Sequence, residues 1–216
     1  MAAWAVFDVD GTLLPGTSME RMFWRCLLRR RRLPASNIIH FMLRGLTGAR
    51  KAGLDGLLKS NKSYVRGLDV SDVRLLAADC YRRRIAPRLA QKGKEAVRDL
   101  RRQGFKIMIV SGAPDFLAEL LRADYAPDLL VGAGLEIESG RYTGRLSTLH
   151  PYGERKKTIL AGLAEKMDLD FVPSIAFADQ PSDIPHLALF GQPVAVNPKR
   201  KLLRHARRHG WQIVSW

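Results

Sequence analysis

Short apolar runs that are typical of β-strands recur along this chain of 216 residues and are separated by helical patterns. The first run ends at Asp8, and helical patterns at 92–103 and 155–166 separate later runs. Strands that alternate with helices favour a parallel, doubly wound α/β sheet, because each parallel strand is reached by a long crossover. A hairpin with a Ser-Gly turn is expected at 136–145. The other strand-like runs cover 106–110, 129–131, 174–177, 193–196 and 211–214.

Residues 15–88 interrupt this alternation. They are rich in arginine, contain no convincing strand and place apolar residues such as Met19 and Met22 at helical spacing. We expect this segment to be an all-helical insertion, or cap. The core would then consist of residues 1–14 and 89–216.

The chain carries a large excess of positive charge. It has 36 Lys and Arg residues against 21 Asp and Glu residues, which gives a formal net charge of +15. This excess implies attraction to anionic partners, which include phosphorylated metabolites, nucleic acids and anionic lipid headgroups. The charge alone does not choose among them. The arginine runs at 29–32 and 82–84 are expected to be solvated helix faces, with attraction to phosphate or lipid as the alternative.

Cys26 and Cys80 are the two cysteines, and neither forms a metal-binding pattern with its neighbours. We expect two reduced, partly buried thiols, which is typical of a cytosolic protein. The N-terminal apolar run is too short for a secretory signal and lacks a basic leader. No apolar stretch approaches the roughly 20 residues that a membrane-spanning helix needs. A soluble, cytoplasmic protein is therefore expected.

Residues suited to phosphate chemistry follow three of the expected strands, at the edge where an open parallel sheet binds its ligands. Asp8 and Asp10 are two residues apart, so their side chains point to the same side of an extended backbone. The glycine and threonine that follow allow a sharp turn that brings backbone N–H groups close to an anion. The local chemistry suits phosphate and Mg²⁺. The residues concerned are Asp8, Asp10, Thr12, Ser111, Gly112, Asp179 and Asp183, with Lys156 at the head of a helix.

The motifs DVDGT, VSGA, GERK and ADQPSDIPHL occur in this order. They resemble the four motifs of the haloacid dehalogenase superfamily. A helical insertion directly after the first motif is similar to the phosphoserine-phosphatase-like branch, subfamily IB. The resemblance covers essentially the whole chain. It implies a Rossmann-like, three-layer core with a helical cap and a phosphatase activity that depends on Mg²⁺.

The resemblance also implies a role for each acid. Asp8 would be the nucleophile that forms an aspartyl-phosphate, and Asp10 would act as general acid and then general base. Mg²⁺ would be held by the carboxylates of Asp8 and Asp179 and by the backbone carbonyl of Asp10. Asp183 would support the water shell of the metal or orient Lys156.

The phosphate-binding roles follow in the same way. Ser111, the N–H of Gly112 and Thr12 would hold phosphate oxygens, although Ser111 also suits a helix N-cap. A lysine would neutralise the charge shared by the nucleophile and the phosphoryl group. The spacing in GERK favours Lys156 over Lys157, which would then be a solvated helix residue.

Some residues near the motifs have a structural alternative. Asp183 would suit the N-cap of a helix that opens with Pro185. His186 is expected to be a packing or surface residue. Asp124 and Asp128 have no partner in the motifs and are expected at the surface.

The start of the cap departs from the phosphoserine phosphatases. Those enzymes carry a glutamate after the first motif that meets the substrate ammonium. The matching position here is Thr17, and Glu20 lies about one helical turn further on. The basic and apolar cap suits a larger or more amphipathic anion than phosphoserine. Its large apolar residues include Trp24, Phe41, Met42 and Leu43.

We therefore expect a Mg²⁺-dependent phosphomonoester hydrolase that acts on a small anionic phosphorylated substrate. Two alternatives stay open. One is a phospholipid headgroup phosphatase whose basic cap contacts an anionic membrane surface. The other is a nucleic-acid-binding module that has kept the fold, which is disfavoured because the chain retains every acid that hydrolysis needs. The sequence does not indicate an oligomeric state.

Overall fold

A six-stranded parallel sheet forms the core of this computed structural model, which describes residues 2–41, 43 and 61–216. The strand order is β3-β2-β1-β6-β7-β8, and every neighbouring pair is parallel. All six apolar runs expected as strands therefore belong to one sheet. The strands are β1 (Trp4–Phe7), β2 (Lys106–Pro114), β3 (Leu129–Ala133), β6 (Ile175–Ala178), β7 (Gln192–Val196) and β8 (Gln212–Val214).

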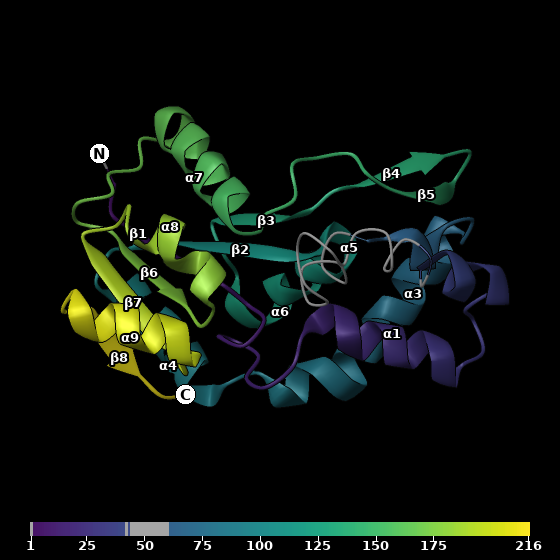
Figure 1. Ribbon diagram of the computed structural model, residues 1–216, viewed down its shortest axis with the longest axis horizontal. Helices are drawn as coiled ribbons and strands as arrows, with labels where there is room; N and C mark the ends of the chain where they lie inside the picture. Colours follow the sequence, from purple (N-terminus) through teal and green to yellow (C-terminus); the bar gives the residue numbers. More distant parts are fainter. Residues whose placement is uncertain (1, 42, 44–60) are drawn as a thin grey trace.

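Apolar side chains cover both faces of the sheet, because neighbouring side chains of a strand point to opposite faces. Phe7 of β1 lies in one buried cluster together with Val97, and Trp4 lies in the other with Leu160. Helices thus pack on each face, which confirms the expected three layers (Figure 1). The helices of this part are α4 (Gln91–Arg102), α5 (Asp115–Ala118), α6 (Arg122–Tyr125), α7 (Glu154–Met167), α8 (Ile184–Leu187) and α9 (Arg200–Arg208), with short 3-10 turns η4 (Glu119–Leu121) and η5 (Pro181–Asp183).

The end of β2 differs from the expectation. The strand was expected to stop at Val110, but it continues to Pro114 after a shift in its register with β3. The reason is that β3 extends to Ala133, which pairs with Pro114 beyond the irregularity. Ser111 therefore lies inside an irregular strand end and does not cap a helix.

Helices make up the described part of the cap, as expected, and α1 and α3 lie at the end of the molecule away from β7 and β8 (Figure 1). The side chain of Ser18 accepts a hydrogen bond from the N–H of Arg21 and so caps α1. Helix α1 ends at Arg29, before Pro34. Met42 lies outside the described residues. The cap elements are α1 (Met19–Arg29), η1 (Ser63–Val65), α3 (Val70–Cys80), the π-helical η2 (Tyr81–Ile85) and η3 (Ala86–Arg88), with helical residues also at 35–41.

The expected hairpin forms from β4 (Leu135–Glu138) and β5 (Arg141–Leu146). Both turn residues have positive φ, 48° at Ser139 and 74° at Gly140, which suits a two-residue hairpin turn. The hairpin extends over the cap, close to α3 (Figure 1). The backbone N–H of Gly67 donates to the carbonyl of Tyr142 at 2.7 Å, so the hairpin is tied to cap residues.

The expectation of two reduced thiols is wrong, because Cys26 and Cys80 form a disulfide. The two residues are 54 positions apart, and their Cα atoms lie 6.4 Å from each other. The packing of α1 against α3 brings them together. Nothing in their spacing along the chain reveals that packing.

Asp128 is exposed at the surface, as expected, whereas Asp124 is half-buried. Asp124 accepts hydrogen bonds from the Tyr81 hydroxyl at 2.5 Å and from the Lys94 ammonium at 2.6 Å. The carboxylate of Asp128, an exposed residue, accepts from the backbone N–H of Ile107 at 2.7 Å. These partners come from distant segments that only the fold brings near. Asp124 thereby connects η2 of the cap to α4 of the core.

Candidate functional site

A cavity of about 690 Å³ opens at the carboxyl ends of β1, β2 and β6 and is lined by both core and cap. Asp8, Gly112 and Asp179 reach it from the three strand ends, and Lys156 reaches it from α7. The β1 end is held against β6 by a hydrogen bond from the Asp8 N–H to the Phe177 carbonyl, 2.9 Å long. The edge of the sheet that was expected to bind a ligand is therefore hollowed.

Lys156 lies between two of the expected acids. Its Nζ is 2.6 Å from Oδ1 of Asp8 and 3.3 Å from Oδ1 of Asp183. Burial by itself would lower the pKa of the Lys156 ammonium, but the charges of Asp183 and Asp8 outweigh it and hold this pKa above its ordinary value. The ammonium stays charged, therefore, at neutral pH. Lys157 is exposed, so the structure places Lys156 and not Lys157 in the cavity.

Three carboxylates gather beside this lysine. Oxygens of Asp8, Asp179 and Asp183 lie within 4.8 Å of one another. Three carboxylates carry more negative charge than the Lys156 ammonium neutralises, which is costly for buried groups. Oxygen donors in this number fit a hard cation such as Mg²⁺. In the described part of the chain, this is the one group of three or more acidic, His or Cys side chains close enough to hold a metal ion.

Gly11 allows the chain to pass directly over Asp179. Its φ is +95°, and a Cβ at this position would lie 2.1 Å from Oδ2 of Asp179. The side chain of Gln180 donates to the same oxygen at 2.5 Å. Sequence reasoning missed Gln180, although its place directly after Asp179 was a signal for it.

The side chain of Asp10 points to the cap. Its Oδ1 accepts a hydrogen bond from the backbone N–H of Met19, 2.9 Å long, at the N-terminus of α1. The partial positive charge of a helix N-terminus favours a carboxylate there. Asp10 lines the cavity but does not belong to the carboxylate cluster, so a metal contact from it would use the backbone carbonyl.

The expected phosphate-binding residues lie at different depths. Gly112 lines the cavity, while Ser111 and Thr12 are buried. The Ser111 Oγ accepts from the N–H of Ala113 at 3.1 Å, and the Thr12 hydroxyl has no hydrogen-bond partner among the described residues. The buried ring of His150 lies against Gly112, with its Nε2 3.1 Å from the Gly112 carbonyl. His150 is 38 residues away, and no motif pointed to it.

Asp183 occupies the N-cap position of α8, as the structural alternative expected, but its side chain makes no capping hydrogen bond to that helix. Its Oδ2 instead accepts from the backbone N–H of Gln180 at 3.3 Å, within the turn η5. This contact aims the other carboxylate oxygen at Lys156. His186 is buried, in agreement with a packing role. Burial and then the charge of Lys156 hold the pKa of His186 well below its ordinary value, so the imidazole is neutral at pH 7.

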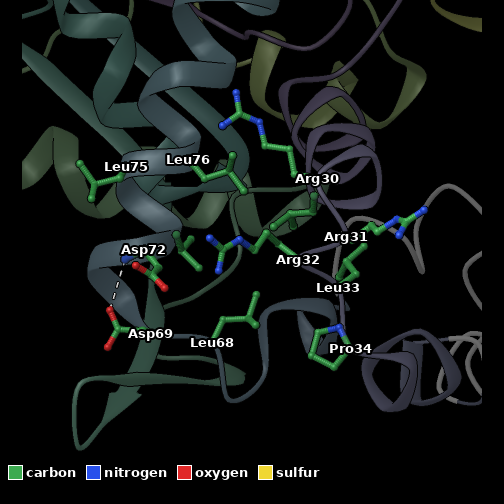
Figure 2. A pocket seen from close by; sticks show the side chains of 12 residues that line it. Arg30, Arg31, Arg32, Leu33, Pro34, Leu68, Asp69, Asp72, Leu75 and Leu76 are labelled. Atoms are coloured by element: carbon green, nitrogen blue, oxygen red, sulfur yellow. Dashed lines mark hydrogen bonds between the residues drawn. The ribbon is translucent and has the colours of Figure 1, made fainter.

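A second cavity of about 750 Å³ lies in the cap, between the end of α1 and α3 (Figure 2). Leucines and the arginine run at 30–32 line it. Figure 2 shows Arg32 directed toward the side that carries Asp72, whereas Arg31 points away from it. Asp69 caps α3 by accepting from the Asp72 N–H. Both arginine runs are exposed, as expected, and this cavity has no carboxylate cluster among the described residues.

Residues 5–188 match the family model of the haloacid dehalogenase-like hydrolases. The chain is 28% identical over 222 residues to phosphoserine phosphatase SerB1 of Mycobacterium tuberculosis, which covers 99% of this chain and 70% of that protein. It is similar to a protein of unknown function from Bordetella pertussis Tohama I, with a TM-score of 0.83, 22% identity, and coverage of 99% of this chain and 98% of that one. A phospho-aspartyl intermediate analogue of phosphoserine phosphatase matches with a TM-score of 0.69, 18% identity, and coverage of 99% and 93%. At these identities, the two structures show a shared fold.

Among the described residues, no helix combines the length and the apolar character that crossing a bilayer requires.

Proposed function

Because this chain belongs to the haloacid dehalogenase-like hydrolase family and is a phosphoric monoester hydrolase, we propose that it cleaves a small anionic phosphomonoester through an aspartyl-phosphate on Asp8. Mg²⁺ is the proposed cofactor. The observation that carries the proposal is the convergence of Asp8, Asp179, Asp183 and Lys156 in one cavity. We also propose that residues 1–14 and 89–216 act as the catalytic core and that 15–88 act as the cap.

Asp8 is the proposed nucleophile. A carboxylate oxygen of Asp8 forms a bond to phosphorus while the bond from phosphorus to the ester oxygen breaks, which divides the hydrolysis into two steps. Asp10 gives a proton to the departing alcohol oxygen. In the second step, Asp10 takes a proton from water, whose oxygen attacks phosphorus, and Asp8 and inorganic phosphate are released.

Lys156 and the end of β2 are the proposed binding groups for the phosphoryl oxygens. The Lys156 ammonium, already paired with Asp8, offsets the charge that the phosphoryl group brings. The N–H of Gly112 and the hydroxyls of Ser111 and Thr12 are the proposed donors to these oxygens. Because these groups are fixed before substrate arrives, little reorganisation is needed during the reaction.

Asp8, Asp179 and the backbone carbonyl of Asp10 would hold Mg²⁺, with Asp183 in support. When bound, the ion supplies positive charge that screens the dianionic phosphate from the acids. Gly11 and Gln180 fix the Asp179 carboxylate for this role, through close backbone approach and a hydrogen bond respectively.

A panel of phosphorylated metabolites and lipids tests the proposed function. Phosphate release is measured with Mg²⁺, with EDTA, and with the Asp8→Asn protein. We expect release from at least one ester, with loss of that release in the variant and in the chelated sample. A correctly folded wild type that is inert toward every ester would overturn the proposal and favour the nucleic-acid-binding module, which predicts salt-sensitive DNA or RNA binding that survives Asp8→Asn.

A cytoplasmic location is the further proposal that accompanies a small phosphorylated substrate. The disulfide between Cys26 and Cys80 argues against it, because the cytosol keeps most thiols reduced. Alkylation of thiols during lysis of the native host decides the question. Two alkylated cysteines support the cytoplasmic proposal, and a protected pair contradicts it.

A further inference from the structure

The carboxylate on the cap side of the active-site cavity is already neutralised by the protein. Glu20 of α1 lines the cavity, and its Oε2 lies 2.5 Å from the Nζ of Lys62. The Lys62 side chain is fully buried, so this ion pair is shielded from solvent. Glu20 therefore has a protein cation as its partner and does not need a substrate ammonium.

Basic side chains also line the cavity. Arg21 and Arg25 line it from α1, and Lys199 lines it from the core rim. Arg25 and Lys199 are both exposed. A substrate with an ammonium group would meet like charges here, and like charges at short range repel.

Aromatic rings form an apolar wall next to these cations. Trp24, Phe41 and Tyr64 all line the cavity. The ring centroids of Trp24 and Phe41 are 6.5 Å apart, and those of Phe41 and Tyr64 are 6.3 Å apart. The side chain of Asn61 donates to the Phe41 carbonyl at 3.0 Å, which fixes the backbone that carries the Phe41 ring. The wall is thus a pre-formed surface for an apolar group.

The Tyr64 side chain is neutral, as expected for part of an apolar wall. Burial, and then the charge of Glu20, raise the pKa of the Tyr64 hydroxyl above its ordinary value. The wall therefore carries no negative charge of its own that would attract an ammonium. The cavity volume of about 690 Å³ also falls in the range of about 300–1,000 Å³ that is typical of sites for drug-sized ligands.

We infer, on the basis of the proposed phosphatase function, that the substrate is a phosphomonoester whose alcohol part is apolar and carries no positive charge. Its phosphate lies at Asp8, and its apolar body packs on Trp24, Phe41 and Tyr64. Phosphoserine, with a small and zwitterionic alcohol part, fits this cavity poorly. An aromatic ring and an acyl chain share the chemistry that the wall recognises.

Four esters in Mg²⁺ buffer test the inference on the wild-type protein. Glycerol 3-phosphate and its 1-octanoyl ester differ only in the apolar body, 1-naphthyl phosphate supplies an aromatic body, and phosphoserine supplies the ammonium. We expect kcat/KM for the octanoyl ester, the naphthyl ester or both to exceed that for glycerol 3-phosphate and phosphoserine by at least about tenfold. If kcat/KM is raised for only one of the two apolar esters, that ester shows whether the wall recognises an acyl chain or an aromatic ring.

Variants of the wall show whether it causes the preference. Trp24→Ala is expected to reduce the ratio of kcat/KM between the preferred apolar ester and glycerol 3-phosphate by about tenfold. Leu28→Ala is the matched control, because Leu28 lies on the same helix but does not line the cavity. Its ratio should equal that of the wild type. If circular dichroism shows that Trp24→Ala is unfolded, Phe41→Leu takes its place.

The outcomes separate the inference from the proposed function. Hydrolysis of phosphoserine or glycerol 3-phosphate at an equal or higher kcat/KM than both apolar esters overturns the inference and leaves the phosphatase function standing. An unchanged ratio in a folded wall variant also overturns it. Failure with all esters of the wider panel overturns the proposed function itself, and the inference with it.

Discussion

Gly11 is the residue on which the position of the Asp179 carboxylate depends most directly. Gly11→Ala would place a Cβ 2.1 Å from Oδ2 of Asp179, so the carboxylate must move. Residues that orient a metal ligand typically contribute about 10- to 100-fold in affinity. We therefore expect the Mg²⁺ concentration for half-maximal activity to rise by about tenfold or more, as measured by a Mg²⁺ titration of phosphate release.

Gly104→Ala is the matched control for this change. Gly104 has a φ of +90°, close to the +95° of Gly11, and no atom lies within 4 Å of the added Cβ. The two variants therefore share the backbone strain, and only one of them meets Asp179. An equal effect of both on the Mg²⁺ requirement would show that strain, and not the clash, is responsible.

Variants of Lys156 and of its neighbour Lys157 distinguish the effect of a lysine's position from the effect of its charge. Lys156→Met removes the cation beside Asp8 and Asp183, and loss of such a fixed donor typically lowers kcat by about 100- to 1,000-fold. Lys157→Met removes the same charge from the surface, so its kcat should stay within about twofold of the wild type. Steady-state kinetics of both variants at saturating Mg²⁺ checks this, and a similar loss in both would contradict the assigned role.

Among the elements, α1 and α3 are joined by the disulfide between Cys26 and Cys80. A cross-link that closes a loop of this length restricts the unfolded chain and typically contributes about 2–4 kcal/mol. We expect reductant to lower the free energy of unfolding of the wild type by about this amount, measured by urea denaturation. The double variant Cys26→Ser, Cys80→Ser should not respond to reductant.

A count of reactive thiols tests whether the disulfide is present. The unreduced, denatured wild type is expected to react with no thiol reagent. Two reactive thiols per chain would contradict the disulfide and support the two reduced thiols that the sequence predicts. In that case, the packing of α1 on α3 would depend on apolar contacts and on the ion pair between Arg30 and Asp79.

Secondary structure was largely predictable because each element carries its own local signal. The apolar runs of β1, β6 and β7 and the Ser-Gly turn of the hairpin are of this kind. The continuation of β2 to Pro114 depends on pairing with β3, and the hairpin's contact with Gly67 depends on the cap. These features are set by distant segments, so a local pattern does not reveal them.

The site was predictable to a similar degree. Asp8 and Asp179 come together because parallel strands deposit their carboxyl ends at one edge, and Lys156 and Asp183 join them from α7 and η5. The contacts on the cap side of the cavity were not predictable, since the pairing of Glu20 with Lys62 joins residues that are 42 positions apart. Motifs identify reacting groups, whereas contacts between distant segments are found only in three dimensions.

At the scale of the whole molecule, the carboxylate cluster predicts that Mg²⁺ stabilises the fold. A ligand that binds only the native state at 100 times its dissociation constant contributes about 2.7 kcal/mol. We expect saturating Mg²⁺ to raise the Tm of the wild type and EDTA to reverse the increase. In Asp179→Asn, which keeps the shape but removes one charge, the increase should be much smaller. An equal increase in both proteins would place the bound ion elsewhere.

The most direct test of the account is to trap the phosphoryl group on the protein. The wild type is mixed with Mg²⁺ and a hydrolysed ester, quenched in acid during turnover, digested and analysed by mass spectrometry. We predict that the added phosphate is found on Asp8, within the peptide that also contains Asp10, and is absent from Asp8→Asn. Turnover with no phosphate on the protein, or with phosphate on another residue, would contradict the account.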